Sequence, residues 1–262
     1  MPLTDSLKTL LLRGLLAGLI AGLLAASVGY FVGEPKIDAA IAIEEAAAAP
    51  AEHGHGEEEA AGGHSHGDDE AEVSRSGQKA GQFLALGLAG MAFGALFALA
   101  INYARRFSTL SGPRLVLTGA VLAWAAIVAV PFFKYPANPP AVGDPDTINE
   151  RTWLWVAAVV VGLLAVAAGV AAYRALASQL GTVQLIAGVA AFVLVTTVGY
   201  IVLPGVNEVA DDFPASLLWE FRVASLAQTA TLWASLGLAF AALTEFASRR
   251  STPVAEQVAT AG

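Results

Sequence analysis

The 262-residue sequence contains no cysteine, so disulfide bridges, thiolate nucleophiles and thiolate metal ligands are excluded. Charged residues are scarce as well: they make up 14% of the chain, against roughly 25% in an average soluble domain. Basic residues are the scarcer sign, with 14 Lys and Arg against 22 Asp and Glu and a net charge of −8. Binding a phosphate backbone needs a basic stripe, so we predict no nucleic acid partner.

Sequence motifs for catalysis are missing too. The chain has no G-x-x-x-x-G-K-[ST] pattern to cradle ATP phosphates and no H-E-x-x-H pattern to hold a catalytic zinc ion. All four histidines lie within residues 53–66, which leaves no histidine elsewhere to act as a general base. We therefore predict that the protein is not an enzyme.

Hydrophobic residues, in contrast, make up 56% of the chain and gather in long blocks. Crossing the hydrocarbon core of a bilayer takes a helix of about 20 apolar residues. Six blocks reach that length, at residues 10–32, 80–103, 115–133, 152–173, 183–203 and 223–246. We predict an all-α, polytopic membrane protein with about six transmembrane helices in a lipid bilayer. The first block resembles a signal peptide in part, but its apolar run exceeds the usual length of about 7–15 residues, which favours an uncleaved helix.

The charges between the blocks predict the orientation. With a cytoplasmic N-terminus, the cytoplasmic segments hold eight basic residues against three acidic ones, and the outer segments hold six against nineteen. Because Lys and Arg concentrate in cytoplasmic connections, we expect both termini inside, in the cytoplasmic (inner) membrane of a bacterium. The expected segments are a first helix (1–32), an acidic His-rich outer loop (33–79), helices two and three (80–133), a Pro-rich outer loop (134–151), helices four and five (152–203), a third outer loop (204–222), a sixth helix (223–250) and a cytoplasmic tail (251–262).

Small residues recur every four positions in the first two blocks. Gly14, Gly18 and Gly22 form one stripe, and Gly90 and Gly94 repeat the spacing. Such stripes let two helix backbones approach closely in a membrane. We therefore predict that they are packing faces.

The stretch AEHGHGEEEAAGGHSHG, residues 51–67, lies in the first outer loop and holds every histidine of the chain. Imidazole and carboxylate ligands without sulfur suit borderline divalent ions such as Co, Ni, Zn or Cu(II). The candidate metal ligands are His53, His55, His64, His66, Glu57, Glu58, Glu59, Asp68 and Asp69. The glycines between the histidines predict an adaptable site of modest affinity, suited to capture. A solvated acidic linker and a pH sensor are the alternatives.

No ionisable residue lies at mid-membrane depth in the predicted helices to mark an ion path. The polar groups there are neutral. Gln228, Thr229 and Thr231 of the last block could offer oxygen ligands to a partly hydrated ion, or could form ordinary interhelical hydrogen bonds.

Four strings on the outer side resemble the CbtA family of predicted cobalt transporter subunits. They are GEPKIDAAIAIEE, EVSRSGQ, KYPANPPAVGDPDTI and LPGVNEV followed by DFPASLLWEFRVASL. The resemblance covers nearly the whole chain. It implies cobalt uptake linked to cobalamin synthesis, and a small CbtB-like partner with a single membrane span and a His-rich end.

By the same resemblance, the functional candidates besides the histidines lie on the outer side. Those expected to line an outer vestibule are Glu34, Glu44, Lys134, Asn138, Asp144, Asn207 and Glu208. Arg75, Arg151, Trp219 and Arg222 are further candidates, with anchoring and ion pairing at the outer interface as their alternative role.

The sequence thus predicts a membrane subunit of a divalent metal uptake system. By the resemblance, the expected ion is Co(II), with Ni(II) or Zn(II) as alternatives. In this interpretation the first loop captures the ion, the vestibule passes it on and neutral polar groups conduct it. A metal-binding membrane scaffold or sensor that conducts nothing is the rival interpretation.

Overall fold

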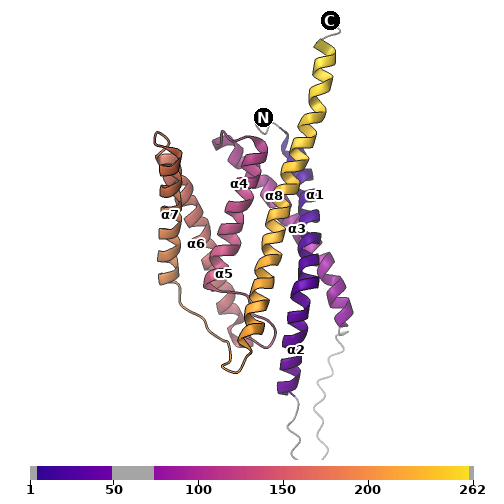
Figure 1. The fold of residues 1–262 in the computed structure, drawn as a ribbon, viewed down its shortest axis with the longest axis vertical. Coiled ribbons are helices and arrows are strands. Elements are labelled where there is room, and N and C mark those ends of the chain that lie inside the picture. Colours follow the sequence, from indigo (N-terminus) through magenta and orange to yellow (C-terminus); the bar gives the residue numbers. More distant parts are fainter. Residues whose placement is uncertain (1–4, 49–73, 260–262) are drawn as a thin grey trace, which may run out of the picture.

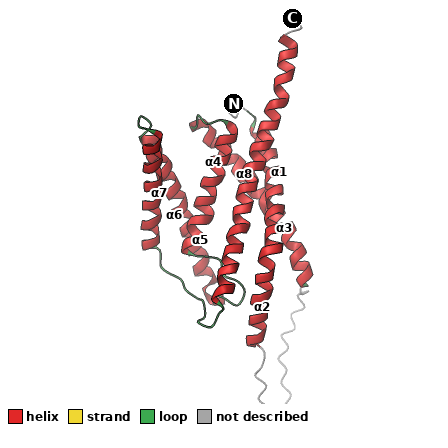
Figure 2. Ribbon diagram, viewed as in Figure 1, coloured by secondary structure: helices red, strands yellow, loops and turns green. Residues whose placement is uncertain are grey.

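The computed structural model describes residues 5–48 and 74–259. Within these ranges the chain forms helices and connecting loops, with no β-strand (Figure 2). Six helical segments are long and apolar enough to cross a membrane: Leu7–Ala47, Arg75–Phe107, Gly112–Lys134, Pro145–Ala175, Gly181–Val202 and Ala215–Ala247. The predicted all-α polytopic fold with six spans is therefore confirmed.

Two of the spans are composite. The first consists of α1 (Leu7–Val28), a π-helical turn (Gly29–Gly33) and α2 (Glu34–Ala48). The third consists of α4 (Gly112–Trp124), a second π-helical turn (Ala125–Ala129) and α5 (Val130–Lys134). The other spans are α3 (Arg75–Ala104), α6 (Ile148–Ala175), α7 (Gly181–Val202) and α8 (Ala215–Ala259).

The start of α1 and the end of α8 lie at the same end of the bundle (Figure 1). We call this the terminal end; the short connections 108–111 and 176–180 lie there too. The opposite end, which we call the loop end, carries α2 and the long connections 135–147 and 203–214.

A proline explains each π-helical turn. Pro35 follows the first turn and Pro131 the second, in both cases two residues after the turn ends. Proline has no backbone N–H, and its ring clashes with the carbonyl group four residues earlier in a regular α-helix. Widening the preceding turn relieves that clash while the helix continues.

The predicted glycine stripes are the contact between α1 and α3. A Cβ atom added to Gly18 would lie 2.1 Å from the carbonyl oxygen of Gly90, and one added to Gly14 would lie 2.3 Å from that of Gly94. The two backbones therefore touch along the stripes, and the packing prediction is confirmed.

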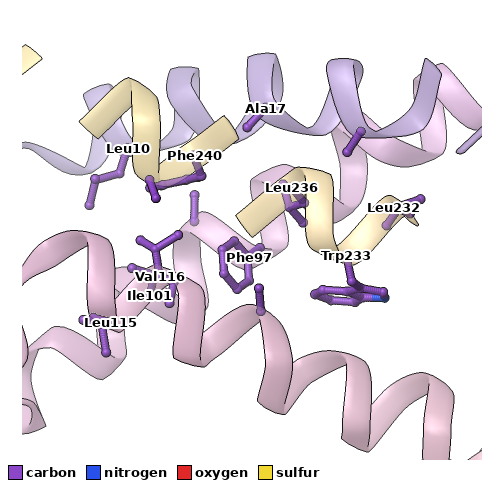
Figure 3. Close-up of a cluster of buried hydrophobic side chains, with 14 of the residues drawn as sticks. Leu10, Ala17, Phe97, Ile101, Leu115, Val116, Leu232, Trp233, Leu236 and Phe240 are labelled. Carbon is purple, nitrogen blue, oxygen red and sulfur yellow. The ribbon is translucent and has the colours of Figure 1, made fainter. Parts of the chain in front are cut away.

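The hydrophobic core lies between α1, α3, α4 and α8 (Figure 3). Phe97 of α3 makes edge-on ring contacts with Trp233 and Phe240 of α8, at centroid distances of 6.2 and 5.9 Å. Leu10 of α1 and Val116 of α4 are fully buried beside them. α6 joins this core at the second π-helical turn, and α7 packs mainly against α6 at the edge of the bundle (Figure 1).

Several helix ends differ from the sequence prediction. The first helix does not stop at residue 32 but continues to Ala48, and α3 begins at Arg75 rather than at residue 80. α6 begins at Ile148 rather than at residue 152, and α8 runs from Ala215 to Ala259 rather than over 223–250. Hydropathy detects only the part of a helix that lies in hydrocarbon, and these extensions are polar or Ala-rich turns beyond it. Much of the expected outer loops and of the expected tail is therefore helical.

Candidate functional site

Four charged side chains of α2 and α3 meet at the loop end. Arg75 pairs with Glu34 and, at 2.8 Å, with Asp38, while Lys79 lies 2.7 Å from Asp38 and 3.9 Å from Glu34. Glu34 is only 7% exposed, whereas the side chain of Asp38 is 44% exposed. We call these four residues the charged cluster. Its two carboxylates balance its two cations, so it joins α2 to α3 without adding net charge.

Two glutamine side chains converge one turn further into the bundle. A Cβ atom on Gly29, the first residue of the π-helical turn, would lie 2.4 Å from Gln82 Nε2 and 2.7 Å from Gln228 Nε2. Glycine at this position leaves room for both amides, one from α3 and one from α8. Gln82 Oε1 is buried, and no described residue gives it a hydrogen bond. Because a buried acceptor without a partner is costly in a membrane, this amide pair is a candidate ligand site.

A separate cavity of about 550 Å³, which neither the charged cluster nor the amide pair lines, lies beside α8. Its walls come from α5 and the second π-helical turn, the first two turns of α6, residues 222–229 of α8, and the connections 135–147 and 203–214. Its polar lining consists of Tyr135, Asn138, Arg151, Thr152, Asn207, Glu208, Arg222, Ser225 and Thr229. We call it the loop-end cavity.

Glu208 holds the two long connections together. One carboxylate oxygen lies 3.2 Å from Arg151 Nη1 and accepts the backbone N–H of Asp144 at 3.1 Å; the other accepts the hydroxyl of Thr147. The hydrogen bond from Thr147, helped by the Asp144 N–H and by the charge of Arg151, lowers the pKa of Glu208 below its ordinary value. Gly143, at φ 121°, lets the chain turn between these groups.

Arg222, about two turns into α8, joins this helix to the connection 135–147. Its guanidinium donates to the carbonyl oxygen of Ala137 at 3.3 Å and to Asn138 Oδ1 at 2.9 Å. On the same face, Lys134 donates to the carbonyl oxygen of Tyr200, and Tyr135 donates to that of Pro204. Burial raises the pKa of Tyr135, so its hydroxyl remains a donor. The alternative role of Lys and Arg at this interface, holding the loops against one another, agrees with these contacts.

The structure divides the predicted vestibule into separate places. The loop-end cavity is lined by Asn138, Asn207 and Glu208. Asp144 and Lys134 lie outside the lining: the backbone N–H of Asp144 donates to Glu208, and Lys134 donates to the carbonyl oxygen of Tyr200. Glu34 belongs to the charged cluster instead, and Glu44 is exposed further along α2. The predicted residues do not line a single vestibule. α8 borders both groups: it lines the loop-end cavity and pairs with α2 through Glu220 and Lys36.

The predicted metal ligands lie outside the described residues. They are His53, His55, His64, His66, Glu57, Glu58, Glu59, Asp68 and Asp69. Within residues 5–48 and 74–259 there is no group of three or more His, Asp or Glu side chains that could hold a metal ion. Metal capture by this loop therefore stays a prediction.

Two hydroxyl groups of α8 bond to their own helix. Thr229 donates to the carbonyl oxygens of Ser225 and Leu226, and Thr231 donates to that of Ala227. The side-chain amide of Gln228, in contrast, lies beside Gly29 together with that of Gln82. Gln82 was missed by the sequence analysis; the available signal was a glutamine four residues after Gln78, inside an apolar helix.

Six helices long and apolar enough to cross a bilayer define a polytopic membrane protein. Residues 7–245, which include nearly all of the six spans, match the family described as probable cobalt transporter subunit (CbtA), and the chain belongs to this family. The family is one of transporter subunits rather than an enzyme class. Comparison with curated proteins and with solved structures gave no match.

Proposed function

We propose that the chain is the membrane-spanning subunit of a cobalt uptake system in the cytoplasmic membrane, working with a small CbtB-like subunit. The observation that supports it most strongly is the family match over 239 of the 262 residues, from 7 to 245. Uptake of Co(II) would serve cobalamin synthesis, and Ni(II) or Zn(II) are the alternative ions. Both termini would face the cytoplasm and the loop end would face outward.

Capture of the ion would fall to the segment between α2 and α3. The last described residue of α2 and the first of α3 both lie at the loop end, so this segment begins and ends there (Figure 1). Its imidazole and carboxylate groups are ligands that suit borderline divalent ions. His53, His55, His64 and His66 would concentrate the ion beside the charged cluster.

The amide pair is the proposed first ligand site within the membrane. Its amides come from α3 and α8 and meet beside Gly29 of the first π-helical turn, and no described residue gives Gln82 Oε1 a hydrogen bond. Neutral amide oxygens attract a partly hydrated cation without trapping it as a carboxylate would. The π-helical turn at Gly29 brings the backbone close to the same point, as such turns often do at functional sites.

The uptake experiment measures cellular cobalt and nickel by mass spectrometry, with and without a CbtB-like partner. We expect cobalt above the empty-vector level at low external concentration. Changing His53, His55, His64 and His66 together to Ala should reduce uptake at low cobalt concentration. Uptake at high cobalt concentration should be unchanged. No accumulation by the parent chain with either partner state would refute transport.

The route is tested with Gln82→Leu and Gln228→Leu. Each should reduce cobalt uptake at least severalfold at saturating metal while the protein level in the membrane stays normal. The matched control is Gln184→Leu, at the terminal end of α7, whose amide donates to Gln179 O at 2.8 Å. Equal uptake by all three variants would exclude the amide pair from the route.

A metal-binding scaffold or sensor is the second candidate. The absence of a multi-residue acid or histidine group from the described part of the chain favours it, because ion paths commonly carry such groups. It predicts cobalt binding by the purified chain without accumulation in cells.

A further inference from the structure

The loop-end cavity has the wrong charge for a bare divalent cation. Its charged lining consists of Arg151, Arg222 and Glu208, two cations against one carboxylate. Glu208 is already paired with Arg151 at 3.2 Å. Arg222 has no carboxylate within ion-pair distance among the described residues, although it is partly buried. A partly buried cation without a counter-charge is unfavourable unless an anion joins it.

Both arginines have donors to offer. A guanidinium carries five N–H groups. Arg222 uses its Nε to reach Ala137 and one terminal nitrogen to reach Asn138, which leaves its other terminal nitrogen. Arg151 Nε is buried and has no acceptor in the described part of the chain. The forked geometry of such groups matches the paired oxygens of a carboxylate or phosphate.

The rest of the lining suits a small organic molecule. The volume, about 550 Å³, exceeds what a single inorganic ion needs and lies within the range of small-molecule sites, roughly 300–1,000 Å³. Phe132 and Trp155 provide apolar walls, and the neutral amides of Asn138 and Asn207 provide further hydrogen-bonding groups. The first turn of α6 also lines the cavity, and the positive end of its helix dipole adds to the attraction for an anion.

We propose that the loop-end cavity binds a small molecule through a carboxylate or phosphate group held by Arg222 and Arg151. Gln82, Gln228 and the four residues of the charged cluster do not line this cavity, so the site is separate from the proposed cation route. Binding is measured on the purified chain in metal-free buffer, and its outcome does not depend on whether the chain transports cobalt.

The test is isothermal titration of the full chain, in nanodiscs of zwitterionic lipid, with citrate and, separately, with dihexanoyl phosphatidylglycerol. We expect saturable binding of at least one probe and a change in Trp fluorescence, because Trp155 lines the cavity. Arg222→Gln should weaken binding about 10- to 100-fold, since the charge-assisted contact from its remaining terminal nitrogen is lost. Arg222→Lys keeps the charge without the fork and should weaken binding less.

The matched control is Arg106→Gln, which removes the same charge from an exposed side chain at the terminal end. It should bind as the parent does. If citrate binds more tightly, the source is a soluble carboxylate; if the phospholipid binds more tightly, it is a lipid headgroup, and the oxyanion site holds in either case. No saturable binding of either probe by the parent, or equal binding by Arg222→Gln and Arg222→Lys, would overturn the proposal.

Discussion

Glu208 and its partners show how residues from distant segments define the loop end. Thr147 and Asp144, which bond to Glu208, are 61 and 64 residues away in the sequence. The sequence analysis selected Glu208, Asn138 and Asp144 as functional candidates, and the structure places all three at or beside the loop-end cavity. It could not predict that the carboxylate is paired, because the pairing depends on how two connections cross in space.

The first prediction concerns the pH dependence of Glu208. Its pKa is lower in the folded protein than its ordinary value of 4.5, so its ionised form stabilises the fold above that pH. The contribution is lost as the pH falls through the folded pKa. Glu208→Gln should therefore melt below the parent at pH 7, and the gap should narrow between pH 5 and pH 3.5. The difference in melting temperature between variant and parent is measured in detergent. Glu44→Gln, at an exposed position, is the control. A gap of constant size down to pH 3.5 would contradict the prediction.

The second prediction concerns the glycine stripes. Gly18→Ala places its Cβ 2.1 Å from a backbone oxygen of α3, which cannot rotate away. We expect a loss of about 1–3 kcal/mol in the free energy of unfolding, the usual cost of overpacking. Gly87→Ala is the matched control, because its Cβ would meet only the ends of two side chains, Leu19 Cδ1 at 3.5 Å and Leu23 Cδ2 at 3.8 Å. The melting temperatures of the two variants are compared. Equal values would show that α1 can move away from α3 without loss of stability.

At the scale of the element, the sequence predicted where helices cross the membrane but not how far they extend. The Ala-rich turns after Pro35 and the turns before Thr152 are too polar for a hydropathy search, yet they are helical. The π-helical turns were also missed. Pro35 and Pro131 were the available signal, because a proline near a continuous apolar helix requires a local change in hydrogen bonding.

The third prediction concerns how strongly the charged cluster keeps α2 packed against α3. Ala40 of α2 is fully buried, so a cysteine there should react slowly with a maleimide. Glu34→Gln leaves Asp38 as the carboxylate that pairs with Arg75 and Lys79. Because Glu34 is buried and its partners are about a third exposed, its loss should cost more than an exposed pair (about 1 kcal/mol) and less than a fully buried one (about 3–5 kcal/mol).

The measurement is the rate at which a maleimide labels Ala40→Cys. No other residue adds a cysteine signal, because the chain has no other cysteine. We expect the rate to rise severalfold in the Glu34→Gln background. Asp38→Asn should raise it less, because Asp38 is largely exposed. Glu44→Gln, on the exposed side of α2, should leave the rate unchanged. An unchanged rate in Glu34→Gln would show that apolar packing alone holds α2.

At the scale of the whole molecule, the count of six spans followed from hydropathy, but most helix neighbours did not. Helices that are apolar all round carry little sequence information about which face meets which partner. The contact of α1 with α3 is the exception, because the glycine stripes marked both faces. The position of α7 at the edge of the bundle could not be predicted, since its sequence is as apolar as that of the buried helices.

The fourth prediction is the orientation. Arg105, Arg106, Arg114 and Arg174 lie near the short connections of the terminal end, where the positive-inside rule places the cytoplasm. Single cysteines at Thr109 and Ser178, both exposed at that end, should react with an impermeant maleimide only after the cells are permeabilised. A cysteine at Gly205, in the connection 203–214 and with open space around it, should react on intact cells. The reverse pattern would place the acidic segment between α2 and α3 in the cytoplasm, where it could not capture ions for uptake. The orientation therefore decides whether the histidines can act before transport.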